Sequence, residues 1–588
     1  GKVEEGNFYG SKLKTNLSIT NDKNYMFEVE GKIEGPFSSL LRFINNDDIY
    51  LDAVTGTHQT NFLYSSPWNK MNSLLDNESK LIINSEVQQA GLVFEQFNYS
   101  FKNIFSSVNY DSSLGIKDGF ISLKLNNIPL VFDLDKQASE AKPSISIFSV
   151  NEIINLKKLF PEPLGSKIKG NSLAEIRIEV PSYLRGVKIA KPRVLFSSNL
   201  NGVRIDLPKP FNKAKQDETG LDLIYTPGFN KPLSRVNFKF GNILRGKLDF
   251  SSSLEQGFII AGKKKQSISI EEGVLSLIGS FDEFDYKILQ LLDLTQDSQT
   301  IDFTIKDLKI GRLIFSDTYF EGVDIKSVRS NEYNAFEISN SSFKGIFSSP
   351  KLPNKIPLLN FDFIDLEFSD DNSSGSFLSI YNNINTQIRF DAKEIILNSE
   401  NYGNWSFDLI PGKDELTLSN LSGKYNKWGL TSNRDQISDL VISKKGLGWR
   451  TDLVTKVYSG SPEKAFKQIG VETNFEMDTF NMEADVTWNS LPWNFDPVEV
   501  NGLIELDING LLIQDRDDIQ TPNNLLRLIN IFNVTDSFEK VTNLDFRKLY
   551  KSGFGADSVK GSLELTDNNI IIKDPLIFKS GSSEFKWT

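Results

Sequence analysis

The chain has 588 residues, with 65 Lys and Arg against 77 Asp and Glu, which makes its formal net charge −12. It lacks the basic footprint that nucleic-acid phosphates require, so we expect no nucleic-acid partner. With no cysteine and one histidine, the chain can form no disulfide, no thiol nucleophile and no metal site built from several histidines.

The apolar residues of the chain are distributed in short runs. None is long enough to cross a membrane as a helix, which takes about 20 residues. Hydrophobic residues make up 39% and charged residues 24%, values typical of a folded chain, yet there are 44 Phe against 16 Tyr and 7 Trp. Because Phe has no polar atom to satisfy, this supply suits a Phe-rich β core or a surface that contacts hydrocarbon, and composition leaves both open.

The first 160 residues repeat a short strand with one polar and one apolar face. The pattern begins in residues 7–35, and Gly35-Pro36 then introduce a short helical turn. Residues 120–134 (FISLKLNNIPLVFDL) predict two strands around Asn126-Asn127. Residues 151–160 (NEIINLKKLF) predict a helical segment that ends at Pro161.

The middle of the chain continues the alternation. In residues 173–180 (LAEIRIEV), Ile176 and Ile178 face one way and the charged residues face the other. Val203 and Ile205 repeat the pattern before the segment LPKPFNK, whose two prolines end a strand and to which we assign no site. Further on, Ile301, Phe303 and Ile305 share a face, and residues 281–294 (FDEFDYKILQLLDL) form the one helical interruption we expect between 222 and 400.

The end of the chain combines strands with two helical segments. Thr521-Pro522 predict a helix start, and the apolar stripe of that helix is Leu525, Leu528, Ile529 and Phe532. A second helix follows up to residue 550, after which the period changes to two. The apolar strand positions here are Ile504, Leu506, Ile508, Leu563 and Leu565.

Catalytic and metal-binding patterns are weak. His58 lies on an alternating stretch, where a half-exposed strand residue is a better prediction than a catalytic base. The acidic run at 515–518 lacks the glycine and glutamate spacing of a calcium loop, and Gly553 and Gly555 lack the spacing of a phosphate-binding loop. We therefore expect no catalytic residue, no metal, no cofactor and no enzymatic activity.

One-sided strands without linkers or a fixed repeat must hide a long, continuous apolar face. That face is either packed by its own side chains or left as a lined groove, and the alternation alone does not distinguish the two.

Four motifs near the C-terminus come in an order that resembles a known family. They are LLRLINIFNV (525–534), LDFRKLY (544–550), KSGFGADS (551–558) and GSLELTDNNIIIKDPLIF (561–578). This order resembles the C-terminal region of the YhdP branch of the AsmA-like proteins, and residues 173–213 and 404–514 resemble other parts of the same family. The resemblance implies a mainly β fold, an elongated, curled antiparallel sheet that forms a hydrophobic groove, with a few short helices.

The resemblance also implies a function. The family is identified with lipid-transfer conduits that carry phospholipids between the inner and outer bacterial membranes across the periplasm. The implied partners are phospholipid acyl chains, both membranes through segments missing here, and a protein at the groove ends. The full-length protein is expected to be anchored to the inner membrane, and this chain to be a fragment without the N-terminal anchor and the C-terminal end.

The resemblance sets the expected organisation. We expect one continuous architecture with soft boundaries: residues 1–150 and 151–440 as groove, and 441–588 as the family's C-terminal region with helices near 523–550. The helix stripe at 525–532 would cap or gate the groove end. The collective groove lining is expected to be Ile176, Ile178, Val203, Ile205, Ile301, Phe303, Ile305, Ile504, Leu506, Ile508, Leu563 and Leu565. Each of these alone fits a packed core equally well.

Two alternatives stay open at this point. A periplasmic scaffold or chaperone for outer-membrane protein assembly would need an exposed sheet edge that can pair with another chain. A β-solenoid enzyme acting on polysaccharide would need clustered carboxylates in a polar cleft.

Overall fold

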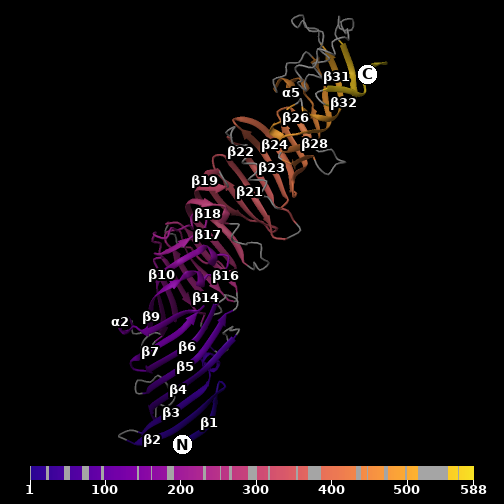
Figure 1. Cartoon of the computed structure of the whole chain (residues 1–588). Helices are drawn as coiled ribbons and strands as arrows, with labels where there is room; N and C mark the ends of the chain where they lie inside the picture. The colour runs from indigo at the N-terminus through magenta and orange to yellow at the C-terminus, as the bar shows by residue number, and fades with distance from the viewer. Residues whose placement is uncertain are drawn as a thin grey trace. The chain divides into compact units, whose positions relative to one another are not determined.

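The structure is a computed structural model, and most of its residues between 2 and 588 can be described. The description leaves out residues 1, 22–24, 46–52, 69–78, 95–98, 142–144, 161, 182–190, 229–232, 252, 264–267, 289–300, 316–317, 353–354, 368–385, 432–438, 447, 469–474, 495, 497–498, 514–553 and 567–568. The chain divides into two compact units, Gly1–Glu321 and Gly322–Thr588. Each is a curled, mainly antiparallel β-structure with a few short helices, as the family resemblance implies (Figure 1).

The first unit contains most of the helical turns that the structure describes. Its strands are β1 (Lys2–Phe8), β2 (Ser11–Asn21), β3 (Tyr25–Pro36), β4 (Ala53–Pro67), β5 (Lys80–Phe94), β6 (Tyr99–Asp111), β7 (Gly115–Leu125), β8 (Ile128–Leu134), β9 (Ile145–Asn155), β10 (Ile168–Pro181), β11 (Arg193–Ser198), β12 (Val203–Ile205), β13 (Leu221–Thr226), β14 (Ser234–Phe240), β15 (Leu244–Phe250), β16 (Leu254–Ala261), β17 (Val274–Asp285) and β18 (Asp302–Phe315). Its helices are α1 (Phe37–Asn45), α2 (Lys136–Ala141), η3 (Leu156–Leu159) and η4 (Gly165–Lys167).

The second unit begins within β19. Its strands are β19 (Thr318–Val328), β20 (Tyr333–Ser339), β21 (Phe343–Pro350), β22 (Leu358–Leu366), β23 (Ile388–Leu397), β24 (Glu400–Pro411), β25 (Glu415–Tyr425), β26 (Trp428–Thr431), β27 (Leu440–Lys445), β28 (Gly448–Ser459), β29 (Phe475–Glu476), β30 (Thr479–Trp488), β31 (Asn501–Ile513), β32 (Phe554–Thr566), β33 (Asn569–Ser580) and β34 (Ser583–Trp587). Its helices are α5 (Pro462–Gln468) and η5 (Pro492–Asn494).

Strand neighbours in each unit mostly follow chain order, because consecutive strands pair as antiparallel hairpins. Among the strand pairs that the structure describes, three are parallel instead: β16 with β17, β17 with β18, and β22 with β23. A parallel pair needs a connection that crosses one face of the sheet. After β16, that connection places Ile268 and Ile270 against Phe258, Ile260 and Ile278.

Local chemistry explains several of these elements. The β7–β8 turn uses Asn126 and Asn127, both at positive φ (46° and 64°), a conformation that Asn tolerates and that tight hairpins require. This confirms the hairpin expected there. Residues 151–155, in contrast, continue β9, and only Leu156–Leu159 form a short 3₁₀ turn, so the helix predicted for 151–160 is wrong. Pairing of β9 with β10 outweighs the helical spacing of these side chains.

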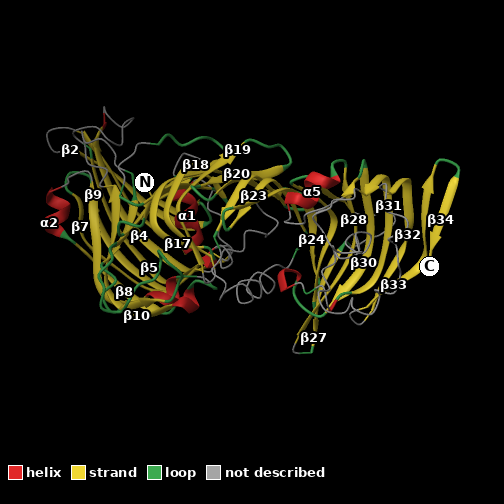
Figure 2. Cartoon of the chain, turned by 90° about the horizontal axis from the view of Figure 1, so that it is seen from above, coloured by secondary structure: helices red, strands yellow, loops and turns green. Residues whose placement is uncertain are grey.

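The largest apolar cluster of the first unit joins α1 to strands β5 to β10. Phe37 of α1 is buried with Val87, Ile104 and Phe148, and the same cluster reaches Ile176 of β10. Figure 2 shows α1 lying within the curl of the first unit. In the second unit, Phe466 of α5 is buried among residues of β30 to β33. No helix in the described part of the chain is long and apolar enough to span a membrane.

Candidate functional site

Eight neighbouring strands of the first unit, β10, β11 and β13 to β18, carry apolar residues at directly paired positions. The first row consists of Ile176, Phe196, Leu223, Phe238, Gly246, Ile259, Leu277 and Ile305. The second row consists of Ile178, Val194, Tyr225, Val236, Leu248, Gly257, Leu275 and Phe303. Members of the two rows are two residues apart on each strand, so both rows lie on one face of the sheet.

This apolar face is accessible along much of its length. Val194 is 37%, Tyr225 42% and Phe303 38% exposed, and most other members are half-buried. Seven strand-to-strand steps of about 4.8 Å give each row a length of roughly 34 Å. One leaflet of bilayer hydrocarbon is about 15 Å thick, so the rows are long enough to contact a lipid chain along its whole length.

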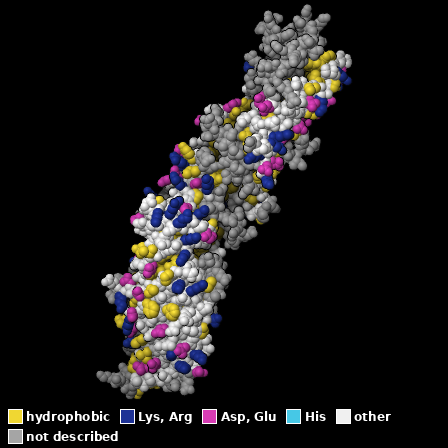
Figure 3. Space-filling model, viewed as in Figure 1, with side chains coloured by type: hydrophobic (Ala, Val, Ile, Leu, Met, Phe, Trp, Pro, Cys, Tyr) yellow, Lys and Arg dark blue, Asp and Glu magenta, His cyan; other side chains and the backbone are white. Residues whose placement is uncertain are grey.

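The opposite face of the same strands carries the charged side chains, together with apolar residues such as Leu195 of β11 and Phe258 of β16. Glu179 pairs with Arg193, and Arg235 Nε donates to Asp249 Oδ1 at 2.6 Å, at positions that alternate with the apolar rows. The hydrogen bond from Arg235 holds the pKa of the Asp249 carboxyl below its usual range. Figure 3 shows charged side chains of both signs spread over the visible face of the first unit. The ionised side chains of these strands therefore alternate with the two apolar rows and lie on the face opposite to them.

The second unit repeats the arrangement. An apolar row crosses β23 to β33 through Ile388, Leu409, Leu418, Leu440, Leu453, Val486, Gly502, Leu565 and Ile570. A row rich in aromatic residues crosses β20 to β24 through Phe336, Phe347, Leu359, Phe390 and Phe407. Within it, the rings of Phe390 and Phe407 stack with centroids 4.6 Å apart.

The twelve expected lining residues fall into three groups. Ile176, Ile178, Phe303 and Ile305 lie in the two rows of the first unit, and Ile301 is half-buried just before β18. Leu565 lies in the row of the second unit. The remaining residues of this group occupy paired positions on β31 and β32: Ile504, Leu506, Ile508 and Leu563. Three of them are buried, and Leu506 packs beside them.

Val203 and Ile205 occupy a different position from the rows. Both lie on β12 and are buried in a small cluster that packs against Phe196, Leu221 and Phe240. They therefore cover a margin of the apolar face instead of forming its floor. The expected gating stripe, Leu525, Leu528, Ile529 and Phe532, lies outside the described residues.

His58 is more deeply buried than the sequence predicts. It is only 4% exposed, so the prediction of a half-exposed histidine is wrong. Its Nε2 lies 3.0 Å from Ser11 Oγ and its Nδ1 lies 3.4 Å from Thr60 Oγ1, which in turn lies 2.8 Å from Ser85 Oγ. Burial lowers the pKa of the imidazole. The two ring nitrogens thus have hydroxyl partners in Ser11 and Thr60. The alternation of residues along β4 does not predict the contact with Ser11, because Ser11 lies on another strand.

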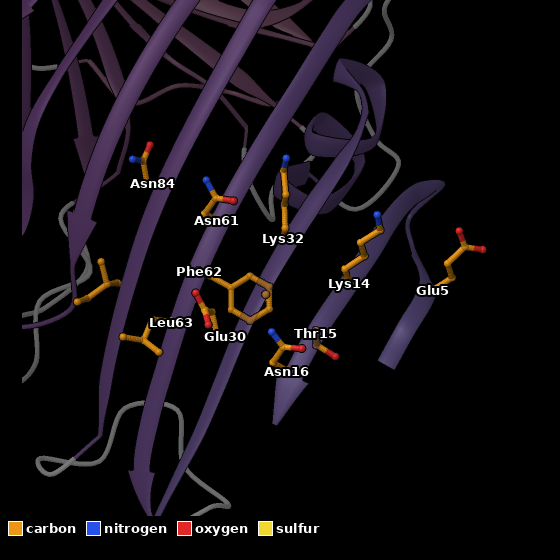
Figure 4. Close-up of a pocket in the computed structure, with 12 residues that line it drawn as sticks. Glu5, Lys14, Thr15, Asn16, Glu30, Lys32, Asn61, Phe62, Leu63 and Asn84 are labelled. Atoms are coloured by element: carbon orange, nitrogen blue, oxygen red, sulfur yellow. The ribbon is translucent and has the colours of Figure 1, made fainter. Parts of the chain in front are cut away.

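A hollow of about 920 Å³ lies over β1 to β5 and has a mixed polar and apolar lining (Figure 4). Lys14, Lys32, Asn61 and Asn84 occupy successive paired positions in β2 to β5 and their side chains share one face. The two lysines at these positions would lose hydration under a lipid chain, so this hollow differs from the apolar rows, which carry no ionised side chain. Among the described residues, no group of three or more His, Cys, Asp or Glu is placed to hold a metal ion.

Comparison with known proteins identifies the family. The model of the family described as YhdP protein matches residues 6–587. The Intermembrane phospholipid transporter YhdP of Escherichia coli (strain K12) is 28% identical over 180 residues, which are 30% of this chain and 13% of that relative. The chain thus matches only a small part of the relative's length. No solved structure matches the chain. Because the family model covers almost every residue, the chain belongs to the YhdP protein family.

Proposed function

We propose that this chain is a segment of a conduit that carries phospholipids between two membranes, with acyl chains lying on the apolar face. The observation that supports this proposal is the pair of continuous apolar rows across β10 to β18. The rows are accessible to a ligand, and none of their paired positions carries an ionised side chain. The printed name of the Escherichia coli relative supports the choice of phospholipid as the ligand.

The energetics favour an acyl chain on this face. Each buried methylene contributes about 0.8 kcal/mol, so ten methylenes in contact contribute about 8 kcal/mol before the cost of ordering the lipid. A charged headgroup loses hydration if it enters the same apolar environment, so it stays at the open side in water. Because no paired position of the two rows carries an ionised side chain, an acyl chain can move along the rows without crossing a charge.

The remaining expectations belong to this proposal. The segment works in the periplasm of a protein anchored to the inner membrane, and it reaches both membranes through segments outside this chain. A protein partner binds at the groove ends, and the conduit acts without enzymatic chemistry. The division at 150 and 440 and the gating role of the helix stripe at 525–532 remain predictions.

Photocrosslinking tests the proposed face directly. A photoreactive amino acid is placed at Leu248, in the second row, or at Lys247, its neighbour on the opposite face of β15. Irradiation in bacterial cells should attach phospholipid at position 248 and leave position 247 unlabelled. Equal labelling at the two positions, or labelling at 247 alone, would contradict the proposal.

A further inference from the structure

Residues 200–215 form a hairpin, called the cover hairpin here, along one margin of the apolar face. Its first arm contains β12 and its second arm residues 213–215. The N–H of Ile205 donates to Lys213 O at 3.0 Å, and the N–H of Lys213 donates to Ile205 O at 3.1 Å. The N–H of Gly202 donates to Lys215 O at 3.0 Å. Two arms with mutual backbone bonds can move as one body.

The base of the cover hairpin is buried and tightly attached. β12 pairs with Ile168–Gly170 at the start of β10, and Val203 is fully buried. At the crossing of the two backbones, a Cβ on Gly170 would lie 2.2 Å from Gly202 O, so glycine is required there. The buried Lys213 Nζ donates to Val203 O at 2.8 Å and ties the two arms together. Detaching this base would expose its apolar core to water.

The middle of the hairpin runs beside the first apolar row. Leu207 packs with the cluster that contacts Leu221 of β13 and Phe240 of β14. These two residues are paired with each other and lie two positions from Leu223 and Phe238 of the first row. The hairpin therefore follows the margin of the face, starting at β10.

The tip of the hairpin reaches β17 through polar contacts. Lys209 forms an ion pair with Glu283, and Arg312 Nη1 lies 3.3 Å from the same carboxylate. The N–H of Asp285 donates to Lys209 O at 2.9 Å. Lys209 and Arg312 are both about half exposed, and exposed ion pairs contribute little to stability.

One aromatic contact completes the attachment of the tip. The ring of Phe211 meets Phe281 of β17 edge-on, with centroids 6.1 Å apart. The hairpin is thus fixed at its base by buried backbone pairing. At its tip it is fixed by the polar contacts of Lys209 with Glu283 and Asp285, called the latch here, and by one ring contact.

We propose that the cover hairpin is a hinged flap over a lateral entrance to the apolar face. The tip separates from β17 while the base stays paired with β10, and an acyl chain enters or leaves between them. This inference rests on the proposed function for its ligand, but the hinge itself is a property of the hairpin.

Hydrogen exchange tests the hinge without any lipid. In the whole chain, the Asp285 amide should exchange faster than the Ile205 amide, because only the first depends on the latch. Lys209→Glu places like charges together and should speed exchange at Asp285 about fivefold while leaving Ile205 unchanged. Lys560→Glu, which breaks the exposed pair with Asp507, is the matched control and should change neither amide. Equal exchange at Asp285 and Ile205 in every form would overturn the hinge.

Cross-linking tests the entrance. Because the chain has no cysteine, Lys209→Cys with Glu283→Cys can be joined specifically by a short bis-maleimide. Uptake of a fluorescent phospholipid from phosphatidylethanolamine–phosphatidylglycerol vesicles should slow at least tenfold. The control pair Lys560→Cys with Asp507→Cys, an exposed pair on the face opposite Leu506 and Ile508, should keep the wild-type rate when cross-linked.

The outcomes separate the two proposals. Unchanged uptake in the cross-linked latch variant would overturn the entrance while leaving the conduit intact. If no form takes up lipid, including the wild type, the proposed function is refuted, and amide exchange still decides whether the hairpin hinges.

Discussion

The substitution Val194→Asp separates lipid binding from folding at one position of the apolar face. Val194 is 37% exposed in the second row, so the new carboxylate stays hydrated when the face is empty. We expect the free energy of unfolding to fall by at most about 1 kcal/mol, as is usual for partly exposed sites. A lipid chain across this position would strip water from the charge, and a cost near 3 kcal/mol weakens binding about 100-fold.

The assay compares this variant with Leu195→Asp. Leu195 is the next residue of β11 and points to the opposite face, where Arg177 is its paired neighbour. Equilibrium binding of a fluorescent phospholipid should fall for Val194→Asp alone, while both variants keep the wild-type circular dichroism and cooperative unfolding. Wild-type binding by Val194→Asp, or an equal loss in both variants, would refute the assignment of lipid to this face.

Three titratable groups give further predictions. Burial lowers the pKa of His58, so the native state resists its protonation; stability should decline as the pH drops below about 6.5, and His58→Asn should weaken this decline in thermal melts. Burial raises the pKa of Asp439, whose Oδ2 accepts a hydrogen bond from the Leu421 N–H at 2.7 Å. At pH 7, Asp439→Asn should therefore unfold at a higher denaturant concentration than wild type. Asp439→Ala should lower the free energy of unfolding by about 1–3 kcal/mol, because it leaves that N–H without an acceptor. For Asp111, burial alone would raise the pKa, but hydrogen bonds from Ser113 and Lys117 lower it to about 2. Its roughly 2 kcal/mol of stability should be present above pH 4 and lost as the pH falls through 2, and Asp111→Asn should lack this acid-dependent part in urea titrations.

Alternation along single strands identified four of the sixteen residues that form the two apolar rows. Ile176, Ile178, Phe303 and Ile305 were identified because a period of two assigns each residue to one side of its strand. The same signal was present in VNFKF (236–240) and contained Val236 and Phe238, which occupy one position in each row. The pattern within one strand does not predict which residues of a neighbouring strand it pairs with, because this register depends on contacts between residues far apart in the chain.

Long-range contacts also explain the expectations that failed. Residues 151–155 have apolar spacing that suits a helix, but the neighbouring β10 offers a full ladder of hydrogen bonds. His58 is buried with its Nε2 against Ser11 Oγ of β2, a residue 47 positions earlier in the chain, and its other ring nitrogen lies near Thr60, which Ser85 of β5 contacts in turn. In the same way, nothing local in LPKPFNK indicates that Lys209 contacts Glu283, 74 residues further on.

Native mass spectrometry combined with lipid extraction tests the central claim most directly. The whole chain is purified from bacterial cells beside the Val194→Asp and Leu195→Asp variants, and bound phospholipid is counted per molecule. We predict phospholipid on the wild type and on Leu195→Asp, and at least a tenfold lower occupancy on Val194→Asp. A folded wild type that carries no phospholipid would contradict the account, and the apolar rows would then be a sheet face with another partner.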